Sequence, residues 1–263
     1  MNKLLLVSSV TSFVLATAAS AGVRVENVTR DIKTKVVDGP TQTVLVQDGK
    51  IRVSSGKDNG MILKGSTIVI VDDGKKTYTE MDKEQMKKMA AQANAAMKQM
   101  QDKLKNMPPE QRAMMEKMMG SQMPGGLDTS KPDVYDAKNT GKTETVEGRK
   151  CTIWNITRNG KLLEESCVVP FSSLPGKEDF EKSFKEMAEA FAEFAKGMPN
   201  VSNQVQVRAN VNGYPVRSRS YDAAGKLRGT ETVLTKWVEE SVPAASFEVP
   251  KGYKKKEMPM MGQ

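Results

Sequence analysis

Methionine is the residue type whose abundance and spacing could do chemistry in this chain. Eleven of the eighteen methionines lie between Met81 and Met123, and the 263 residues include no histidine and only two cysteines. A thioether sulfur is a soft ligand that suits Cu(I). Methionine is also a flexible apolar side chain that adapts to ligands of irregular shape. The cluster is therefore compatible with a soft-metal site or with an apolar binding surface.

A soft-metal site would draw on the methionines near the end of this stretch. Sites for Cu(I) usually combine thioethers with imidazole or thiolate ligands, and the chain has no histidine to contribute. The spacing of most of the methionines is that of side chains packed along a helix. We keep Cu(I) or Ag(I) binding as a third hypothesis and predict no cofactor; the candidate ligands would be Met114, Met115, Met118, Met119 and Met123.

The absence of histidine also removes the common catalytic sites. A Ser-His-Asp triad, a Cys-His pair and a histidine-bearing zinc site cannot be built from this chain. Carboxylates occur in adjacent pairs, Asp72-Asp73 and Glu164-Glu165, but neighbours on a strand point to opposite faces, so we interpret them as turn and edge residues. No EF-hand calcium loop occurs. We predict that the protein is not an enzyme.

Cys151 and Cys167 are expected to form a structural disulfide, because the chain begins like an exported protein and exported thiols are oxidised. The sequence between them reads as a β-hairpin. A three-residue loop over Arg158-Asn159-Gly160 would place Cys151 directly opposite Cys167, whereas a two-residue Asn-Gly turn would leave them out of register. The disulfide therefore favours the three-residue loop.

Residues 1–21 read as a cleavable signal peptide. Lys3 precedes an apolar run that is too short and too rich in hydroxyls for a membrane anchor, and Ala19-Ser20-Ala21 is typical of a cleavage site. We expect the mature chain to begin near Gly22 and to lie in the periplasm or outside the cell. No cysteine follows the cleavage region, so no lipid anchor is expected there.

The charge pattern indicates a solvated surface rather than a nucleic-acid site. The formal net charge is +8, but Lys and Glu are interleaved, and no basic patch is interleaved with aromatic residues. Lys254-Lys255-Lys256 stands beside Met258, Met260 and Met261. We interpret residues 254–263 as a disordered basic tail, with a peripheral membrane contact as the alternative.

Short β-branched runs separated by turn signals fill the chain from Val23 to Met81 and predict an antiparallel meander. Asp48-Gly49 and Asp73-Gly74 are strong hairpin signals. The period changes at Asp82, where Asp82 and Gln85 are spaced as a capping box. An apolar stripe then predicts a helix; its members are Met86, Met89, Ala93, Met97, Met100, Leu104 and Met107.

Pro108-Pro109 ends that helix and opens a second one, which Gly120 can close, so residues 82–120 form a helical insert. A flexible connector is expected over 121–139. Strands should resume at Thr143 to Val146, followed by the disulfide hairpin. A further apolar stripe predicts another helix: Phe180, Phe184, Met187, Phe191, Phe194 and Met198.

The remaining strands are expected at Val205 to Val211, Val216 to Tyr221, Leu227 to Val238 and Ser246 to Val249. Helices inserted between antiparallel meanders indicate an α+β fold. Several short motifs resemble an uncharacterised family of exported bacterial proteins related to the LolA/LolB-like periplasmic lipoprotein carriers: Lys50-Ile51-Arg52-Val53, the stretch from Asp72 to Tyr78, Gly213-Tyr214-Pro215, Val242-Pro243 and the stretch from Phe247 to Tyr253.

This resemblance implies one LolA-like domain over 22–253, in which a curved antiparallel sheet forms a half-barrel covered by the Met-rich hairpin and the Phe-rich helix. The concave face of such a sheet can shelter acyl chains. The chain differs from the carriers in its larger, methionine-rich insert and in its lack of the lipid anchor of the LolB type.

We therefore expect a non-catalytic binding protein for an apolar ligand, such as a lipid, an acyl chain or a lipoprotein-like partner. A structural or protein-interaction module without a small ligand is the alternative, and the oligomeric state stays open. The candidate ligand-binding residues are Met86, Met89, Met97, Met100, Met114, Met118, Phe184 and Phe191.

Overall fold

The structure is a computed structural model that describes residues 21–56, 59–108, 110–111, 133–195, 203–204, 206–208, 210–222 and 224–257. The expected signal peptide up to Ser20, the second helix of the Met-rich insert beyond Gln111 and the first part of the expected connector lie outside these residues. No helix among the described residues is long and apolar enough to span a bilayer.

Twelve strands of the described chain form one open sheet, in the order β12-β6-β5-β4-β3-β2-β1-β11-β10-β9-β8-β7. Neighbouring strands are antiparallel except β12 and β6, which are parallel. The first six strands are β1 (Ala21–Asp31), β2 (Gln42–Gln47), β3 (Lys50–Ser55), β4 (Asn59–Lys64), β5 (Thr67–Asp72) and β6 (Thr77–Met81). The others are β7 (Tyr135–Val146), β8 (Arg149–Arg158), β9 (Lys161–Val169), β10 (Tyr214–Tyr221), β11 (Leu227–Ser241) and β12 (Lys254–Lys255).

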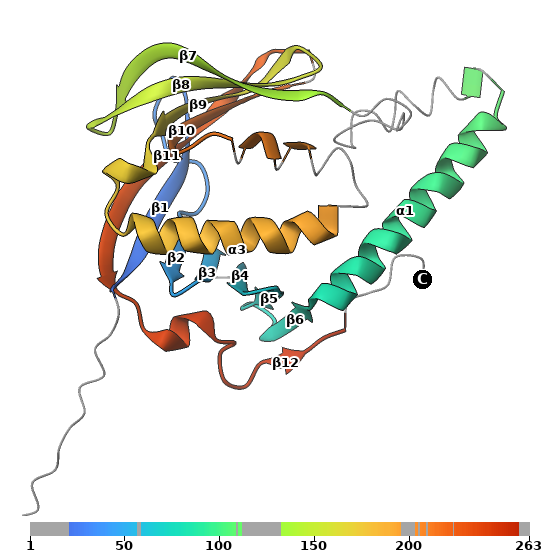
Figure 1. Cartoon of the computed structure of the whole chain (residues 1–263), viewed down its shortest axis with the longest axis horizontal. Helices are drawn as coiled ribbons and strands as arrows, with labels where there is room; N and C mark the ends of the chain where they lie inside the picture. The colour runs from blue at the N-terminus through green and yellow to red at the C-terminus, as the bar shows by residue number, and fades with distance from the viewer. Residues whose placement is uncertain are drawn as a thin grey trace, which may run out of the picture.

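The sheet curls around helix α3 (Lys177–Ala195), so that β7 to β10 lie above the helix and β2 to β6 below it in Figure 1. Helix α1 (Lys83–Lys105) follows β6 and contacts α3. Two 3-10 turns complete the fold, η1 (Phe171–Ser173) and η2 (Ala244–Phe247). The α+β class and the curved, unclosed antiparallel sheet are confirmed.

The structure confirms the predicted start of the first helix, α1. The Asp82 side chain accepts a hydrogen bond from the Gln85 backbone N–H at 2.8 Å, and the Gln85 side chain accepts one from the Asp82 N–H at 3.0 Å. This reciprocal pair is the capping box that begins α1. Of the predicted Phe-rich stripe, Phe180, Phe184 and Met187 lie on α3, where Phe180 is fully buried; Met198 lies outside the described residues.

The face of the sheet that α3 packs against, here called the inner face, carries the main core. Strand alternation and pairing put one row of apolar residues on it. Phe180 anchors α3 there, with its ring centroid 4.8 Å from Trp237 and 5.6 Å from Tyr214. The row includes Val23, Val25, Val46, Ile51, Leu63, Ile68 and Leu234.

On the outer face, the C-terminal segment covers strands β3 to β6. Phe247 and Val242 pack against Ile62, Val69 and Val71 in a second apolar cluster. The strand predicted at Ser246 to Val249 is wrong, because the chain makes the 3-10 turn η2 there as it crosses the sheet. Arg52 holds this turn by donating from Nη1 to the Ser246 carbonyl at 3.0 Å.

The expected tail and the expected connector are both shorter than the sequence suggested. Lys254 and Lys255 form β12, which pairs with Thr77 and Tyr78 at the edge of the sheet, so the first residues of the expected tail 254–263 are ordered. Strand β7 begins at Tyr135, so the expected connector 121–139 cannot extend beyond residue 134. Backbone pairing to a neighbouring strand fixes both segments, and neither carries a strong local signal.

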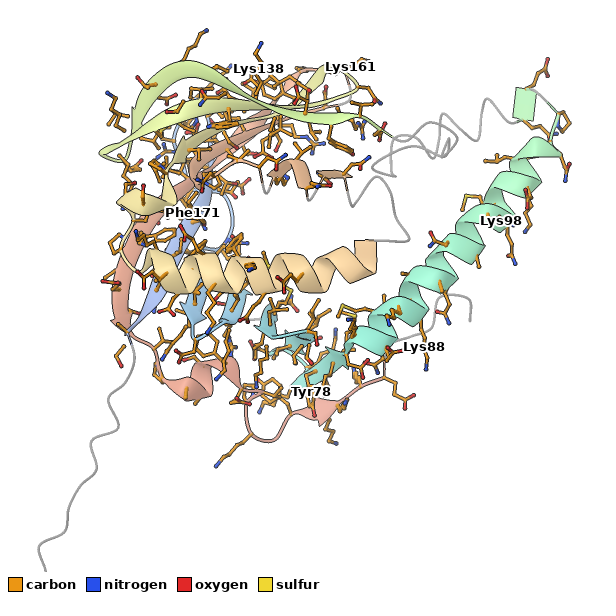
Figure 2. All side chains as sticks on the ribbon, viewed as in Figure 1. Tyr78, Lys88, Lys98, Lys138, Lys161 and Phe171 are labelled. Carbon is orange, nitrogen blue, oxygen red and sulfur yellow. A yellow bond between two sulfur atoms is a disulfide. The ribbon has the colours of Figure 1, made fainter. Side chains whose placement is uncertain are left out.

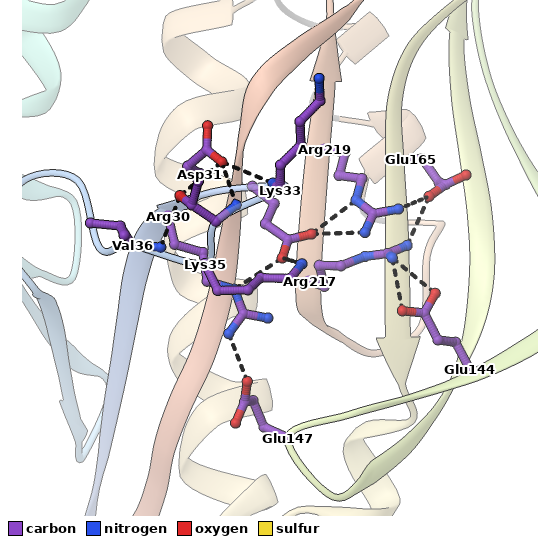
Figure 3. A network of polar contacts seen from close by, with 12 residues as sticks. Arg30, Asp31, Lys33, Lys35, Val36, Glu144, Glu147, Glu165, Arg217 and Arg219 are labelled. Carbon is purple, nitrogen blue, oxygen red and sulfur yellow. Dashed lines mark hydrogen bonds and ion pairs between the residues drawn. The ribbon is translucent and has the colours of Figure 1, made fainter.

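The outer face of β9, β10, β11 and β1 carries a buried network of ion pairs (Figure 3). Arg217 is 2% exposed and binds Glu144 at 2.9 Å and Glu165 at 2.8 Å. Glu231 is 1% exposed and accepts from Arg30, Lys35 and Arg219. Charged side chains can be buried when they are paired in this way.

The disulfide between Cys151 and Cys167 is present, but the predicted hairpin loop is wrong. Arg158 pairs with Lys161, so the turn has two residues, Asn159 and Gly160, with φ of 52° and 75°. These are the dihedrals of a type I′ turn. A register shift beyond the turn pairs Cys167 with Ile153, and the disulfide therefore joins diagonal positions.

The strand predicted from Val205 to Val211 is also wrong, since residues 203–204 and 206–208 are helical. The Asn210 N–H bonds to the Gln206 carbonyl four residues back, as in an α-helix. Arg208 and Val211, three residues apart, both line the pocket described below. The alternating valines of this segment fit a strand and a helical turn equally well, and packing against the sheet selects the helical turn.

Candidate binding pocket on the concave face

A pocket of about 230 Å³ lies between the inner face of the sheet and the elements that cover it. One wall comes from β8, β9 and the start of β10. The other wall comes from η1, α3 and residues 206–213, here called the covering segment, of which residue 209 lies outside the described part. The lining residues are Trp154, Ile156, Glu164, Ser166, Val168, Phe171, Phe184, Arg208, Val211, Gly213, Tyr214 and Pro215.

The sheet wall follows from strand alternation. Trp154 on β8 pairs with Ser166 on β9, and Ile156 pairs with Glu164. Residues two apart on a strand point to the same face, so Val168 joins them. These side chains share the inner face, while the disulfide and the Arg217 network lie on the outer face.

The helix wall is aromatic. The Phe184 ring stacks on Phe180 with centroids 4.6 Å apart, and it lies 6.4 Å from Phe171. Figure 2 shows Phe171 inside the curl of the sheet, near the beginning of α3. Phe180 is fully buried, but Phe184, one turn later, is 37% exposed. Phe184 therefore presents part of its ring to the pocket instead of to the core.

One end of the pocket is polar and holds a buried carboxylate. Glu164 accepts from Arg208 Nη2 at 2.5 Å and from the Ser166 hydroxyl at 2.5 Å, and Ser166 is hydrogen bonded to Ser218 at 2.9 Å. Burial alone would raise the pKa of Glu164, but the hydrogen bond and charge of Arg208, together with the two hydroxyls, lower it below its ordinary value. The carboxylate is therefore ionised at neutral pH.

Tyr214 closes the pocket where it meets the core. Its ring contacts Trp237 edge to face, with centroids 4.9 Å apart, and its hydroxyl accepts a hydrogen bond from Asn27 Nδ2 at 3.0 Å. Burial raises the pKa of Tyr214, so the hydroxyl stays neutral. A second, larger pocket beside the covering segment is lined mainly by polar residues: Asp133, Val134, Tyr135, Asn203, Gln206, Val207 and Asn210.

A family described as a domain of unknown function, DUF4412, matches residues 74–253 of the chain. The chain belongs to this family. Its match covers β6 to β11, both long helices and the candidate pocket, and begins after the first five strands. No curated protein matches the sequence.

Several solved structures are similar to this DUF4412 protein over most of its length, at low identity and low TM-score. An uncharacterised conserved protein from Thermus thermophilus has a TM-score of 0.42 at 9% identity, over 91% of both chains. A LolA superfamily protein from Nitrosomonas europaea has a TM-score of 0.29 at 10% identity, over 87% of this chain and 89% of that one. The Pseudomonas aeruginosa MucA/MucB complex has a TM-score of 0.30 at 12% identity, over 89% of this chain and 56% of that one.

The expected membership of a family of unknown function is thus confirmed by the family match. With TM-scores below 0.5, these likenesses support no further conclusion about the chain. They assign no ligand or partner to the DUF4412 chain.

The predicted ligand-binding residues do not lie together in the pocket. Phe184 lines it, whereas Met86 is 3% exposed and belongs to the main core. Met89 and Met100 are partly exposed on α1 and do not line the pocket. The side chains of Met97 and Phe191, and the whole of Met114 and Met118, lie outside the described residues, as do Met115, Met119 and Met123. The binding role of these residues stays a prediction.

Most residues of the pocket were not predicted from the sequence. Trp154, Ile156 and Val168 lie in the hairpin that the sequence predicts. Their neighbours Ile153 and Val169 are also apolar, so the sequence does not say which face of the hairpin lines a pocket. Arg208 lay in the segment mistaken for a strand. These residues meet only when the sheet curls over the covering segment.

The two carboxylate pairs had different outcomes. Asp73 lies in a turn, as predicted, and accepts from the Tyr253 hydroxyl, whereas Asp72 is the last residue of β5 and accepts from the Lys75 N–H of that turn. Glu164 and Glu165 do point to opposite faces, but they are not edge residues, because β9 lies between β8 and β10. Among the described residues, no group of three or more Asp, Glu or Cys side chains is placed to hold a metal ion.

Proposed function

We propose that this protein is an exported, non-catalytic binding protein that holds the hydrocarbon part of a ligand in the pocket on the inner face. The partial exposure of Phe184 beside the fully buried Phe180 carries this proposal. An aromatic ring left half exposed inside a concave, apolar site is in position to contact an apolar ligand.

The composition and size of the pocket favour one hydrocarbon chain. Its lining is mostly apolar, with a single charged pair at one end, which is the usual composition of a small-molecule site. Its volume of about 230 Å³ lies below the range of roughly 300–1,000 Å³ that is common for drug-sized ligands. One acyl chain therefore fits better than a complete diacyl lipid.

Export is supported by two independent features. The first 21 residues have the composition of a signal peptide. Cys151 and Cys167 form a disulfide, and structural disulfides persist in oxidising compartments. Together they favour the periplasm as the place where the ligand is bound.

The proposal is tested by ligand binding to the full-length exported protein. We expect native mass spectrometry to find a retained apolar molecule, and dodecanol to displace a bound apolar dye. Phe184→Asp should weaken dye binding at least about tenfold, because it places a charge in an apolar wall. Leu227→Asp is the matched control, since Leu227 is similarly exposed at 38% and does not line the pocket.

Two results would overturn the proposal. One is the absence of both a retained ligand and dye binding in the wild-type protein. The other is that Phe184→Asp and the wild-type protein bind the dye with equal affinity, when circular dichroism shows that both proteins are folded.

A further inference from the structure

The arginine at the polar end of the pocket has hydrogen-bond donors to spare. Arg208 carries five N–H donors in a planar guanidinium, and Nη2 donates to Glu164. Within the described part of the chain, Glu164 is the residue that Arg208 binds, and the arginine side chain is 44% exposed. The remaining donors are therefore accessible to a ligand.

Glu164, in contrast, is much less accessible than Arg208, with its side chain 11% exposed. One carboxylate oxygen accepts from Ser166 and the other from Arg208. The whole residue is 9% exposed. Its charge is compensated by Arg208, and its place between Ser166 and Arg208 orients the guanidinium. The polar end of the pocket therefore exposes the donors of Arg208 more than the acceptors of Glu164.

We propose that Arg208 selects single-chain amphiphiles with an oxyanion head group, whose hydrocarbon chain lies against Trp154, Ile156 and Phe184. This inference rests on the proposed function, because it names the ligand class of the same pocket. A guanidinium binds carboxylate and phosphate oxygens through two parallel N–H donors. The accessible guanidinium would repel a cationic head group, and a neutral alcohol would accept a hydrogen bond from it without the attraction between opposite charges.

The net charge of the whole protein also favours an anionic ligand. The formal net charge is +8, which attracts anionic ligands at low ionic strength. The oxyanion could be a carboxylate or a phosphate monoester, and the two are distinguished by measuring both.

The test compares four probes that share one hydrocarbon chain, below their micelle concentrations. Dodecanoate, dodecyl phosphate, dodecanol and dodecylamine are titrated by dye displacement against the full-length exported protein. We expect at least one of the two anions to bind about tenfold or more tightly than dodecanol, and dodecylamine to bind no better than dodecanol. The anion that binds more tightly identifies the head group.

Three variants isolate the role of Arg208. Arg208→Gln should remove the preference for the anion over dodecanol, whereas Arg208→Lys should keep part of the preference. Because Arg208→Gln leaves Glu164 buried and unpaired, the double variant Arg208→Gln/Glu164→Gln supplies a neutral pocket of similar shape and should show the same loss of preference. Arg228→Gln changes an exposed arginine outside the pocket and should behave as wild type.

The outcomes separate this inference from the proposed function. If dodecanol and both anions bind wild type equally, or if Arg208→Gln and the double variant keep the preference, Arg208 does not select the head group, although the pocket still binds chains. Tighter binding of dodecylamine than of dodecanoate would reverse the assignment. If no probe binds at all, the proposed function fails as well.

Discussion

Arg30 on β1 and Glu147 at the tip of the β7-β8 hairpin are 117 positions apart in the sequence, and their side chains meet at 2.8 Å. Strands β9, β10 and β11 separate them in the sheet order. The hairpin tip therefore folds back across the outer face of these strands to reach β1 (Figure 3). Arg217 and Glu231 are buried beneath this hairpin. Ion pairs therefore stabilise the curvature of the sheet together with apolar packing.

Arg217 is the central residue of this ion-pair network, and its removal should destabilise the protein. Arg217→Ala removes the buried partner of Glu144 and Glu165, which are themselves 40% and 25% exposed, so we expect a loss of about 1–3 kcal/mol. Urea unfolding followed by circular dichroism measures the loss. Arg24→Ala is the control, because Arg24 is 36% exposed and exposed pairs contribute less than about 1 kcal/mol. Equal losses for the two variants would show that burial of Arg217 contributes nothing.

The network should also make stability depend on pH through Glu231. Burial alone would raise the pKa of Glu231, but the hydrogen bonds from Lys35, Arg30 and Arg219 lower it from 4.5 to about 2. Since the folded-state pKa is the lower one, ionised Glu231 stabilises the fold above about pH 4.5, and this contribution is lost as the pH falls toward 2.

Glu231→Gln tests this dependence. We expect the variant to be less stable than wild type at pH 6, and the difference between the two unfolding free energies to shrink between pH 4.5 and pH 2. Urea unfolding at several pH values supplies both curves. Glu181→Gln, at an exposed position on α3, should follow wild type throughout. A difference that is constant over this pH range would mean that Glu231 titrates normally in the folded protein.

Local sequence signals predicted the elements of the fold well. The Asp48-Gly49 turn is present, with Gln47 paired to Lys50 and both turn residues at positive φ. The Asp73-Gly74 turn is present but longer, since Asp72 pairs with Thr77 and Lys76 takes the positive φ. Here the Asp72 side chain accepts from the Lys75 N–H and selects a turn that the Asp-Gly pair alone does not specify.

The pocket could not be predicted, because it depends on register and on long-range packing. Bulges shift the pairing beside Glu26 on β1, between Pro215 and Arg217 on β10, and beyond Ile156 on β8. Each bulge changes which residues oppose one another, and the sequence carries no clear signal for them. The pairing of Arg208 with Glu164 likewise joins two segments 44 positions apart.

The disulfide should contribute substantially to stability. Cys151 and Cys167 are 16 positions apart, and closing a loop of that size stabilises a protein by about 3 kcal/mol in the chain-entropy estimate. We expect the double variant Cys151→Ala/Cys167→Ala to lose an amount of this order in urea unfolding. Because both cysteines are almost fully buried, the native wild-type protein should resist dithiothreitol until it unfolds. Rapid reduction of the folded protein would contradict the buried placement.

Phe180 and Phe184 lie one helical turn apart on α3, and substitutions of the two should have different effects. We expect Phe180 to matter for stability and Phe184 for ligand binding. Phe180 is fully buried and its ring contacts those of Phe171, Tyr214 and Trp237, so Phe180→Ala should cost about 3–5 kcal/mol. Phe184 is 37% exposed, and Phe184→Ala should cost only about 1 kcal/mol while weakening the binding of an apolar dye. Phe180→Leu keeps most of the core volume and should leave dye affinity near wild type. Comparable unfolding losses for Phe180→Ala and Phe184→Ala would show that the Phe184 ring belongs to the core, which would remove the apolar wall on which binding depends.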